Sequence, residues 1–197
     1  MMLALALVAA LGITTLDGRP VDVWRDDAID GRQPMAGRRA LVLVFIRHDC
    51  PVSNRYVPEL NRLYDEFHAQ GIQIYVVYSG REHDGESACA HHAEYGLRAP
   101  GLLDPDLRLA SVAGTTVTPE AAVFATPFPH QRPEIKDRRP SLVYLGRLDD
   151  RAQGAGLWRP SPTTRDLRDV LLRVARGEHV GATHTQAHGC YLRSLSH

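Results

Sequence analysis

The sequence predicts an α/β fold with a central mixed sheet, because it contains two buried strands with a helix between them. Residues 40–46 (ALVLVFI) and 72–79 (IQIYVVYS) are unbroken apolar runs rich in β-branched side chains, as expected of strands covered on both faces. Between them, apolar side chains recur at helical spacing: Tyr56, Leu60, Leu63, Tyr64 and Phe67. A strand–helix–strand unit places its two strands parallel, with a right-handed crossover.

The elements on either side of this unit follow from local patterns. Residues 13–24 alternate around Asp17-Gly18, which predicts a short opening hairpin. Helical spacing and terminal glycines predict further helices over residues 84–96, 106–114 and 164–176. Two more strands are predicted, over 121–125 and 141–150, the second leaving its sheet at Gly146. Residues 127–140, crowded with Pro, Arg and Lys, predict an exposed loop.

Length and composition point to one compact domain, with no nucleic-acid partner and no membrane span expected. A chain of 197 residues suits a single core, and its 44% hydrophobic and 23% charged residues are ordinary for a globular protein. The 23 basic and 23 acidic side chains cancel, so no overall field attracts nucleic acid or an anionic membrane. We expect the main domain over residues 13–178 and a Gly- and His-rich tail over 179–197 that carries Cys190.

The first twelve residues, MMLALALVAALG, resemble the apolar part of a secretory signal. Ala10 and Gly12 offer a small-x-small cleavage site, although a basic leader is missing. No other segment reaches the roughly 20 apolar residues that a membrane span needs. We therefore expect export, to the periplasm or a similar compartment; the alternative is a flexible end or first strand of a cytoplasmic protein.

Cys50 is the candidate reactive group. It directly follows the predicted strand 40–46 and begins the predicted helix, with Pro51 in the first turn where a proline fits. The unpaired N–H groups and the dipole at a helix N-terminus favour a thiolate over a thiol, so we expect an acidified Cys50. Arg47, His48 and Arg55 could add positive potential, while Asp49 opposes them.

A redox-active cysteine usually has a second cysteine three residues later, and this chain has none there. In Cys50-Pro51-Val52-Ser53 the second redox position is a serine, so Cys50 works alone, recruits an external thiol, or uses a distant cysteine. Three cysteines in all are too few for a disulfide scaffold or a paired zinc ribbon. Cys190 in the Gly-flanked tail is the best internal candidate, and we interpret Cys89, on a predicted helix, as a packing residue.

Several motifs together resemble a known family. The order of the elements, Pro58 eight residues after Cys50, and Thr118-Pro119 directly before a strand resemble the thioredoxin fold. The segments DCPVSNRYVPEL, TVTPEAAVF and LVYLGRLDD and the late Gly-Cys resemble redoxin-domain proteins of the broad alkyl hydroperoxide reductase and thiol-specific antioxidant group. The resemblance covers about residues 13 to 192.

This resemblance implies a thioredoxin-like fold and a thiol-dependent oxidoreductase without a cofactor. Catalytic roles fall to Cys50, to Cys190 as the resolving thiol, and to Ser53 at the second position of the motif. A substrate pocket forms from Pro51 and a cis-proline loop at Thr118-Pro119, which packs against the active cysteine. The substrate class is a protein thiol, disulfide or sulfenic acid, or a small peroxide. Peroxidases of this group carry Thr or Ser three residues before the attacking cysteine, where this chain has Arg47.

The rival hypothesis is a non-catalytic module of the same fold that binds copper or a protein partner. Copper-assembly proteins with this fold use a Cys-x-x-x-Cys pair, and here Asn54 stands in the second place. A looser site from Cys50, Cys190, His184 and His188 would suit a soft metal ion. Two adjacent pairs are interpreted as solvated surface groups instead of site residues: His91 with His92, and Asp149 with Asp150.

Overall fold

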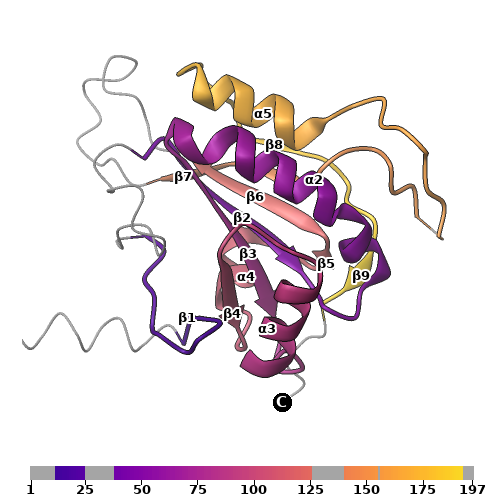
Figure 1. The fold of residues 1–197 in the computed structure, drawn as a ribbon. Helices are drawn as coiled ribbons and strands as arrows, with labels where there is room; N and C mark the ends of the chain where they lie inside the picture. The colour runs from indigo at the N-terminus through magenta and orange to yellow at the C-terminus, as the bar shows by residue number, and fades with distance from the viewer. Residues whose placement is uncertain (1–11, 25–37, 126–139, 155, 193–197) are drawn as a thin grey trace, which may run out of the picture.

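The computed structural model describes residues 12–24, 38–125, 140–154 and 156–192. Seven strands form one sheet in the order β1-β4-β3-β2-β6-β7-β8, and a separate pair, β5-β9, lies at its end (Figure 1). Helices α2, α3 and α5 contribute to the core on one face of the sheet, and α4 with the opening segment to the core on the other. The α/β class and the mixed sheet are confirmed.

The central strands of the sheet are those that the sequence predicted. Strand β2 (Ala40–Ile46) has all seven residues buried and lies between β3 (Ile72–Ser79), which is parallel to it, and β6 (Glu120–Ala125), which is antiparallel. The bounds of β2 and β3 are those predicted, because a short apolar run rich in β-branched residues favours a strand covered on both sides.

Helix α2 (Pro51–Phe67) covers the sheet with its apolar side and contains Pro58. A short 3₁₀ turn (His68–Gln70) extends it to Gly71, whose φ of 78° suits a glycine and ends the helix. Helix α5 (Asp166–Ala175) lies beside α2 (Figure 1).

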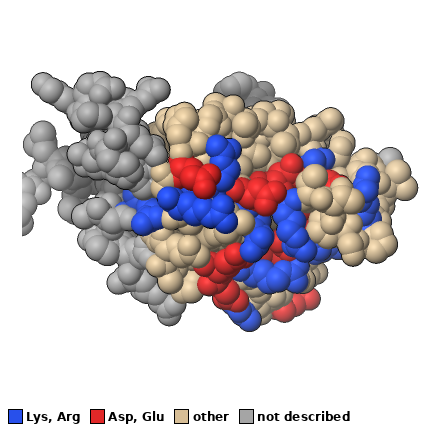
Figure 2. Space-filling view, turned by 90° about the horizontal axis from the view of Figure 1, so that it is seen from above, with Lys and Arg blue, Asp and Glu red and all other residues tan. Residues whose placement is uncertain are grey.

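The surface over α2 and α5 carries both signs of charge. Figure 2 shows acidic and basic side chains interspersed on this face, and Arg168 of α5 bonds Glu66 of α2 at 2.7 Å. No single-sign field results there, in agreement with the cancelling charges of the sequence.

The remaining elements complete the sheet and its second face. Helix α3 (Gly85–Glu94) begins at Asp84, whose carboxylate accepts a hydrogen bond from Ser87 N. Strand β4 (Gly101–Asp104) precedes α4 (Arg108–Ala113), and β7 (Ser141–Gly146) pairs with β6. None of the helices in the described part of the chain is long and apolar enough to cross a bilayer.

The predicted opening hairpin is only partly present. The turn at Asp17-Gly18 forms, but Thr14 makes a single bridge to Pro20, while β1 (Thr14–Thr15) pairs antiparallel with β4. The edge of the large sheet thus takes the place of a second hairpin strand. The possible signal at residues 1–12, apart from Gly12, and the predicted loop at 127–140, apart from Pro140, lie outside the described residues.

The C-terminal segment is extended along the sheet, where the sequence suggested a loose tail. Strand β8 (Thr183–His184) pairs parallel with β7, and β9 (Cys190–Tyr191) pairs antiparallel with β5 (Val117–Thr118). Gly146 makes room for this path: a methyl group at its Cα would collide with the backbone and side chain of Thr185.

The solvated strand end predicted at Asp149 and Asp150 is wrong, because both side chains are buried. The carboxylate of Asp149 accepts a hydrogen bond from Tyr56 OH at 2.8 Å, and that of Asp150 accepts one from Thr163 N at 2.7 Å. Each carboxylate therefore accepts a hydrogen bond from a segment far away in the sequence, and these bonds hold the loop after β7 in place.

The packing role predicted for Cys89 is also wrong. Its side chain is exposed on α3, and its thiol donates to Leu16 O at 3.5 Å. The buried face of α3 is formed by Ala88 and His91 instead.

Candidate functional site

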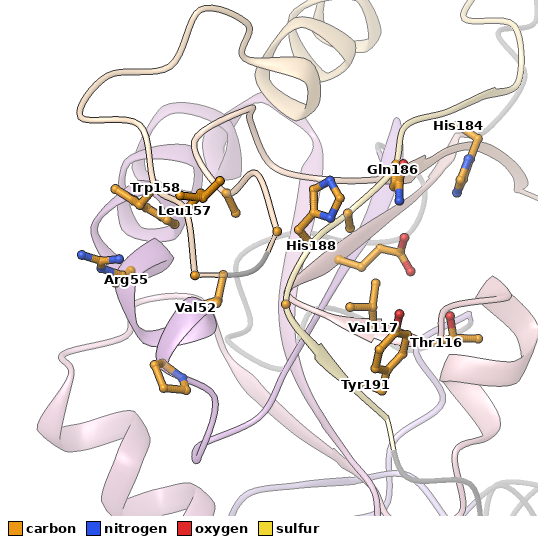
Figure 3. A pocket seen from close by; sticks show the side chains of 17 residues that line it. Val52, Arg55, Thr116, Val117, Leu157, Trp158, His184, Gln186, His188 and Tyr191 are labelled. Atoms are coloured by element: carbon orange, nitrogen blue, oxygen red, sulfur yellow. The ribbon is translucent and has the colours of Figure 1, made fainter.

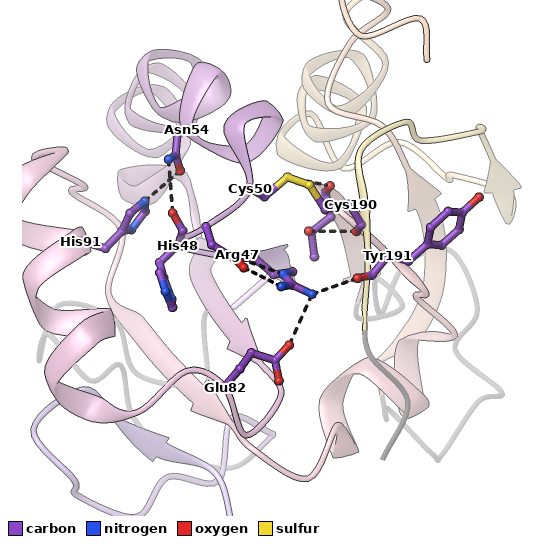
Figure 4. The surroundings of a disulfide bond; sticks show 10 residues. Arg47, His48, Cys50, Asn54, Glu82, His91, Cys190 and Tyr191 are labelled. Carbon is purple, nitrogen blue, oxygen red and sulfur yellow. Dashed lines mark hydrogen bonds and ion pairs between the residues drawn. A yellow bond between two sulfur atoms is a disulfide. The ribbon is translucent and has the colours of Figure 1, made fainter. Parts of the chain in front are cut away.

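Cys50 lies where the sequence placed it, between the end of β2 and the first turn of α2. It is the N-cap residue of α2, in an extended conformation, and its side chain is fully buried. Its Sγ is bonded to Sγ of Cys190, which lies 140 residues further along the chain at a Cα–Cα distance of 6.0 Å (Figure 4). The structure thus brings together the two cysteines that the sequence analysis named.

The cis-proline loop meets this disulfide. The Thr118–Pro119 peptide bond is cis, both residues are buried, and Thr118 O lies 3.6 Å from Cys50 Sγ. On the other side, Thr118 is paired with Cys190 across the β5–β9 ladder, and its Oγ1 donates to Cys190 O at 3.2 Å. One threonine therefore contacts both halves of the disulfide.

The other two predicted site residues on α2 lie on different sides of the helix. Pro51 is exposed and faces a groove beside the disulfide. Ser53 is fully buried, and its hydroxyl has no hydrogen-bond partner among the described residues. Ser53 is thus covered from solvent in this oxidised form.

Arg47 ties the end of β2 to the C-terminal strand. The guanidinium is buried and donates to both carboxylate oxygens of Asp49, at 2.9 and 2.7 Å, and to Tyr191 O at 3.1 Å (Figure 4). It also pairs with Glu82 at 3.4 Å. The hydrogen bond from Arg47 lowers the pKa of Asp49 to about 2. The carboxylates of Asp49 and Glu82 therefore balance the positive charge of Arg47 that was expected to act on Cys50. No sequence pattern indicated that Glu82 and Tyr191 would contact Arg47.

The other two positive groups expected near Cys50 also have partners. The Arg55 guanidinium lies over the Trp158 ring, 4.9 Å from its centroid. Nδ1 of His48 lies 2.6 Å from Nδ1 of His83, a buried histidine from the loop after β3. Burial, and then the neighbouring His48, lower the pKa of His83 to about 4.

His91, predicted to lie on the surface, is buried under the Cys50 loop, so that prediction is wrong. Its Nδ1 lies 2.8 Å from Tyr78 OH and its Nε2 lies 2.9 Å from Asn54 Oδ1. Asn54 in turn donates from Nδ2 to His48 O at 3.3 Å. This chain of contacts connects α3 to the loop that carries Cys50, and burial lowers the pKa of His91 to about 4. Its neighbour His92 is partly exposed and contacts Ala99 O at 2.9 Å.

A groove of about 560 Å³ opens beside the disulfide, between the first turn of α2, the loop at 152–158 and the C-terminal segment (Figure 3). Its wall includes the chain neighbours of both cysteines, Pro51, Gly189 and Tyr191. Val52, Leu157 and Trp158 lie on one side of the groove together with the Arg55 guanidinium, and the imidazoles of His184 and His188 line it from the C-terminal segment (Figure 3). The groove can accept a side chain or segment that approaches the disulfide.

The looser metal site is not assembled in the part of the chain that the structure describes. Within residues 12–24, 38–125, 140–154 and 156–192, no three His, Cys, Asp or Glu side chains are arranged to hold a metal ion. Cys50 and Cys190 are bonded to each other, so neither offers a thiolate to His184 or His188.

The α/β sheet, the cysteine that begins α2 and the cis-proline against it define the class: the chain is a thioredoxin-like redoxin-domain protein with a redox-thiol site. Within that class, residues 32–128 match the AhpC/TSA family. No curated protein sequence matches the chain.

Two solved structures resemble most of the chain. A hypothetical protein from Sinorhizobium meliloti 1021 has a TM-score of 0.65 and 26% identity, with 82% of each chain covered. An uncharacterized conserved protein from Geobacillus kaustophilus has a TM-score of 0.70 and 23% identity, with 94% of this chain and 89% of that chain covered. Both likenesses cover a larger share of the chain than the segment that matches the family.

Proposed function

We propose that this protein is a thiol–disulfide oxidoreductase in which Cys50 and Cys190 are the redox pair. The observation that carries the proposal is the buried disulfide that joins the N-terminus of α2 to a strand paired with the cis-proline loop. A thiolate at Cys50 is stabilised by the helix N-terminus, which makes it both a good nucleophile and a good leaving group.

The reaction begins from the dithiol. The Cys50 thiolate attacks one sulfur of a substrate disulfide, forms a mixed disulfide, and releases the second substrate sulfur as a thiolate. The Cys190 thiolate then attacks Cys50 Sγ, forms the intramolecular disulfide, and releases the first substrate sulfur. The substrate gains two electrons, and an external dithiol that becomes a disulfide returns the pair to its starting state.

Each predicted pocket residue has a place in this scheme. Thr118, which precedes the cis-proline, contacts the Cys50 sulfur through its carbonyl oxygen, and Pro51 lines the groove through which a substrate approaches. Ser53 lies three residues after Cys50 on α2, so both residues share one side of the helix. We propose that its hydroxyl, which has no partner in the oxidised form, donates to the Cys50 thiolate once the disulfide opens.

Arg47 favours a disulfide or sulfenic acid on a protein over a small peroxide as the substrate. It stands where the related peroxidases hold a Thr or Ser, three residues before the cysteine. Its donors are engaged by Asp49, Glu82 and Tyr191, which leaves little capacity to bind a peroxide oxygen.

Turnover with a dithiol and a protein disulfide tests the proposal. We expect Cys50→Ser to abolish reduction of the substrate disulfide, and Cys190→Ser to accumulate the mixed disulfide at Cys50. Cys89→Ser is the matched control and retains wild-type turnover, because Cys89 lies apart from the disulfide on α3. Equal turnover of all three variants contradicts the proposal. Free thiols that bind copper in the purified protein would favour the rival metal-carrier hypothesis.

Export of the protein is a separate proposal. It is supported by the apolar residues 1–12, which resemble the hydrophobic part of a secretory signal. N-terminal sequencing of the mature protein after cell fractionation tests it. Cleavage at the small-x-small site formed by Ala10 and Gly12, in a periplasmic fraction, is the expected result, and an intact chain in the cytosol contradicts it.

A further inference from the structure

The C-terminal segment 186–192, here called the strap, covers the strand edge closest to the reactive sulfur. The residues before it remain anchored to the large sheet, because β8 pairs with β7 and Thr185 N donates to Leu145 O at 3.0 Å. Strand β9 of the strap pairs with β5, placing Cys190 opposite Thr118 and Tyr191 opposite Val117. Thr118 O is the atom that contacts Cys50 Sγ. The strap therefore shows that an extended segment can lie on β5 with its cysteine bonded to Cys50.

The strap depends on few interactions besides the disulfide. Leu192 N donates to Thr116 O at 2.9 Å, Thr118 Oγ1 donates to Cys190 O at 3.2 Å, and Arg47 donates to Tyr191 O at 3.1 Å. No residue of the strap is buried, and Tyr191 is 78% exposed. Because little apolar surface is removed from water, the covalent bond to Cys50 contributes a large part of the attachment.

We propose that the strap is an internal occupant of a docking edge for protein substrates, and that reduction of Cys50–Cys190 releases it. This inference rests on the proposed function and adds its substrate class and regulation. The partner is an extended segment of another protein that pairs with β5 through its backbone and carries a cysteine opposite Thr118. Its neighbouring side chains lie in the groove beside Pro51 and Trp158.

The electrons for opening the disulfide come from the same external dithiol that the proposed function requires. An external dithiol gives two electrons and two protons to the Cys50–Cys190 disulfide, whose S–S bond breaks, and the dithiol becomes a disulfide. The strap then detaches, and β5 accepts the substrate strand while Cys50 attacks its disulfide. When Cys190 attacks Cys50 Sγ, the strap returns to β5, where it occupies the same backbone groups as the substrate. Resolution thereby displaces the product.

Competition between strap and substrate follows from tethering. A strand attached to the same chain has an effective concentration in the millimolar range, so an untethered segment competes poorly while the strap is bonded. Reduction removes the disulfide anchor at Cys190, so the strap is then held to β5 by noncovalent contacts alone, dissociates more often, and leaves the edge open to a substrate strand. The oxidised protein is thus closed to protein substrates and the reduced protein is open.

Hydrogen–deuterium exchange of the full chain tests the release of the strap. We expect the amide of Leu192 to be protected in the oxidised protein and to exchange at least about tenfold faster after reduction, since only a weak hydrogen bond then holds it. Cys190→Ser should exchange at the reduced rate under all conditions, and Cys89→Ser should behave as the wild type. Protection that survives reduction and the Cys190→Ser change overturns the gating.

A peptide probe tests strand pairing at β5. The acceptor is the full chain with Cys190→Ser and Cys89→Ser, which leaves Cys50 as its one thiol. The probe has the sequence of residues 187–193, with its cysteine activated as a thionitrobenzoate mixed disulfide. We expect it to react with Cys50 about fivefold faster than the same peptide N-methylated at the position of Leu192, which lacks the donor to Thr116 O.

The outcomes separate this inference from the proposed function. Equal rates for both peptides and for activated glutathione mean that no strand docks on β5, which overturns the inference while Cys50 still exchanges disulfides. A Cys50 that reacts with none of the three probes overturns the proposed function and the inference together.

Discussion

Gly189 lies against the carbonyl oxygen of Thr118 so closely that a side-chain carbon on Gly189 would overlap it. The contact joins the residue before Cys190 to the residue before the cis-proline, and it requires that position 189 carry only hydrogen. The close approach of the strap to the cis-proline loop therefore depends on a glycine.

Gly189→Ala is predicted to make the disulfide easier to reduce. The added methyl group pushes the strap from β5, at a cost of about 1–3 kcal/mol as for other overpacked sites, which raises the reduction potential by roughly 20–60 mV. Redox titration against a dithiol measures the shift. Gly181→Ala is the control, because no atom lies within 4 Å of the added carbon there. Equal potentials for both variants would contradict a close contact.

Thr118→Val is predicted to act in the same direction with a smaller effect. Valine keeps the branched shape and removes the hydroxyl that donates to Cys190 O at 3.2 Å. Loss of one net hydrogen bond, about 1 kcal/mol, raises the reduction potential by about 20 mV. The exposed Thr116→Val, two residues earlier, serves as the control and should leave the potential unchanged. A lower potential in Thr118→Val would refute the role of this hydroxyl.

The parts of the fold that sequence predicts well are those with a strong local signal. Strands β2 and β3 have the predicted bounds because each is a continuous apolar run, and Gly71 ends its helical turn because its positive φ suits glycine. Cys50 and Thr118-Pro119 were found through their positions relative to these elements. Their meeting at 3.6 Å follows from the parallel unit and the strand β6 beside it.

The sequence does not predict the C-terminal strands β8 and β9 or the buried polar groups, because distant parts of the chain determine where they lie. Strands β8 and β9 have two residues each, too few for a periodic pattern, and they are placed by pairing partners far away in the chain. The burial of Asp149 and His91 likewise depends on donors from other elements, Tyr56 and Tyr78. Charge alone favoured the surface for these residues, and tertiary hydrogen bonds outweighed that preference.

Tyr56→Phe is predicted to destabilise the fold by about 1.5–3 kcal/mol, the usual range for a buried hydrogen bond to a charged group. Tyr56 is buried, and its hydroxyl donates to the Asp149 carboxylate at 2.8 Å. Burial is the main cause that raises the pKa of Tyr56, and this hydrogen bond raises it further. Urea unfolding measures the loss. Tyr191→Phe, with a ring 78% exposed, is the control and should change stability by less than about 0.5 kcal/mol. A loss of that small size for Tyr56→Phe would contradict the buried bond.

His83 is predicted to make the fold sensitive to acid. Burial and the facing His48 lower the pKa of His83 from its ordinary 6.5 to about 4, against the opposite pull of Glu82 and Asp49. Between these two pH values the unfolded chain binds more protons at this site than the folded one, so stability falls as the pH drops from 6.5 to 4 and then levels off. A shift of this size corresponds to about 3 kcal/mol.

The measurement is the free energy of unfolding in urea at several pH values across that window. His83→Gln should flatten the dependence by up to this amount, whatever it does to stability at neutral pH, because the titrating group itself is gone. His179→Gln is the matched control, since His179 is exposed, and it should retain the full slope. An unchanged slope in His83→Gln would mean that the acid sensitivity arises elsewhere, with His91 the next group to replace, because burial lowers its pKa to about 4 as well.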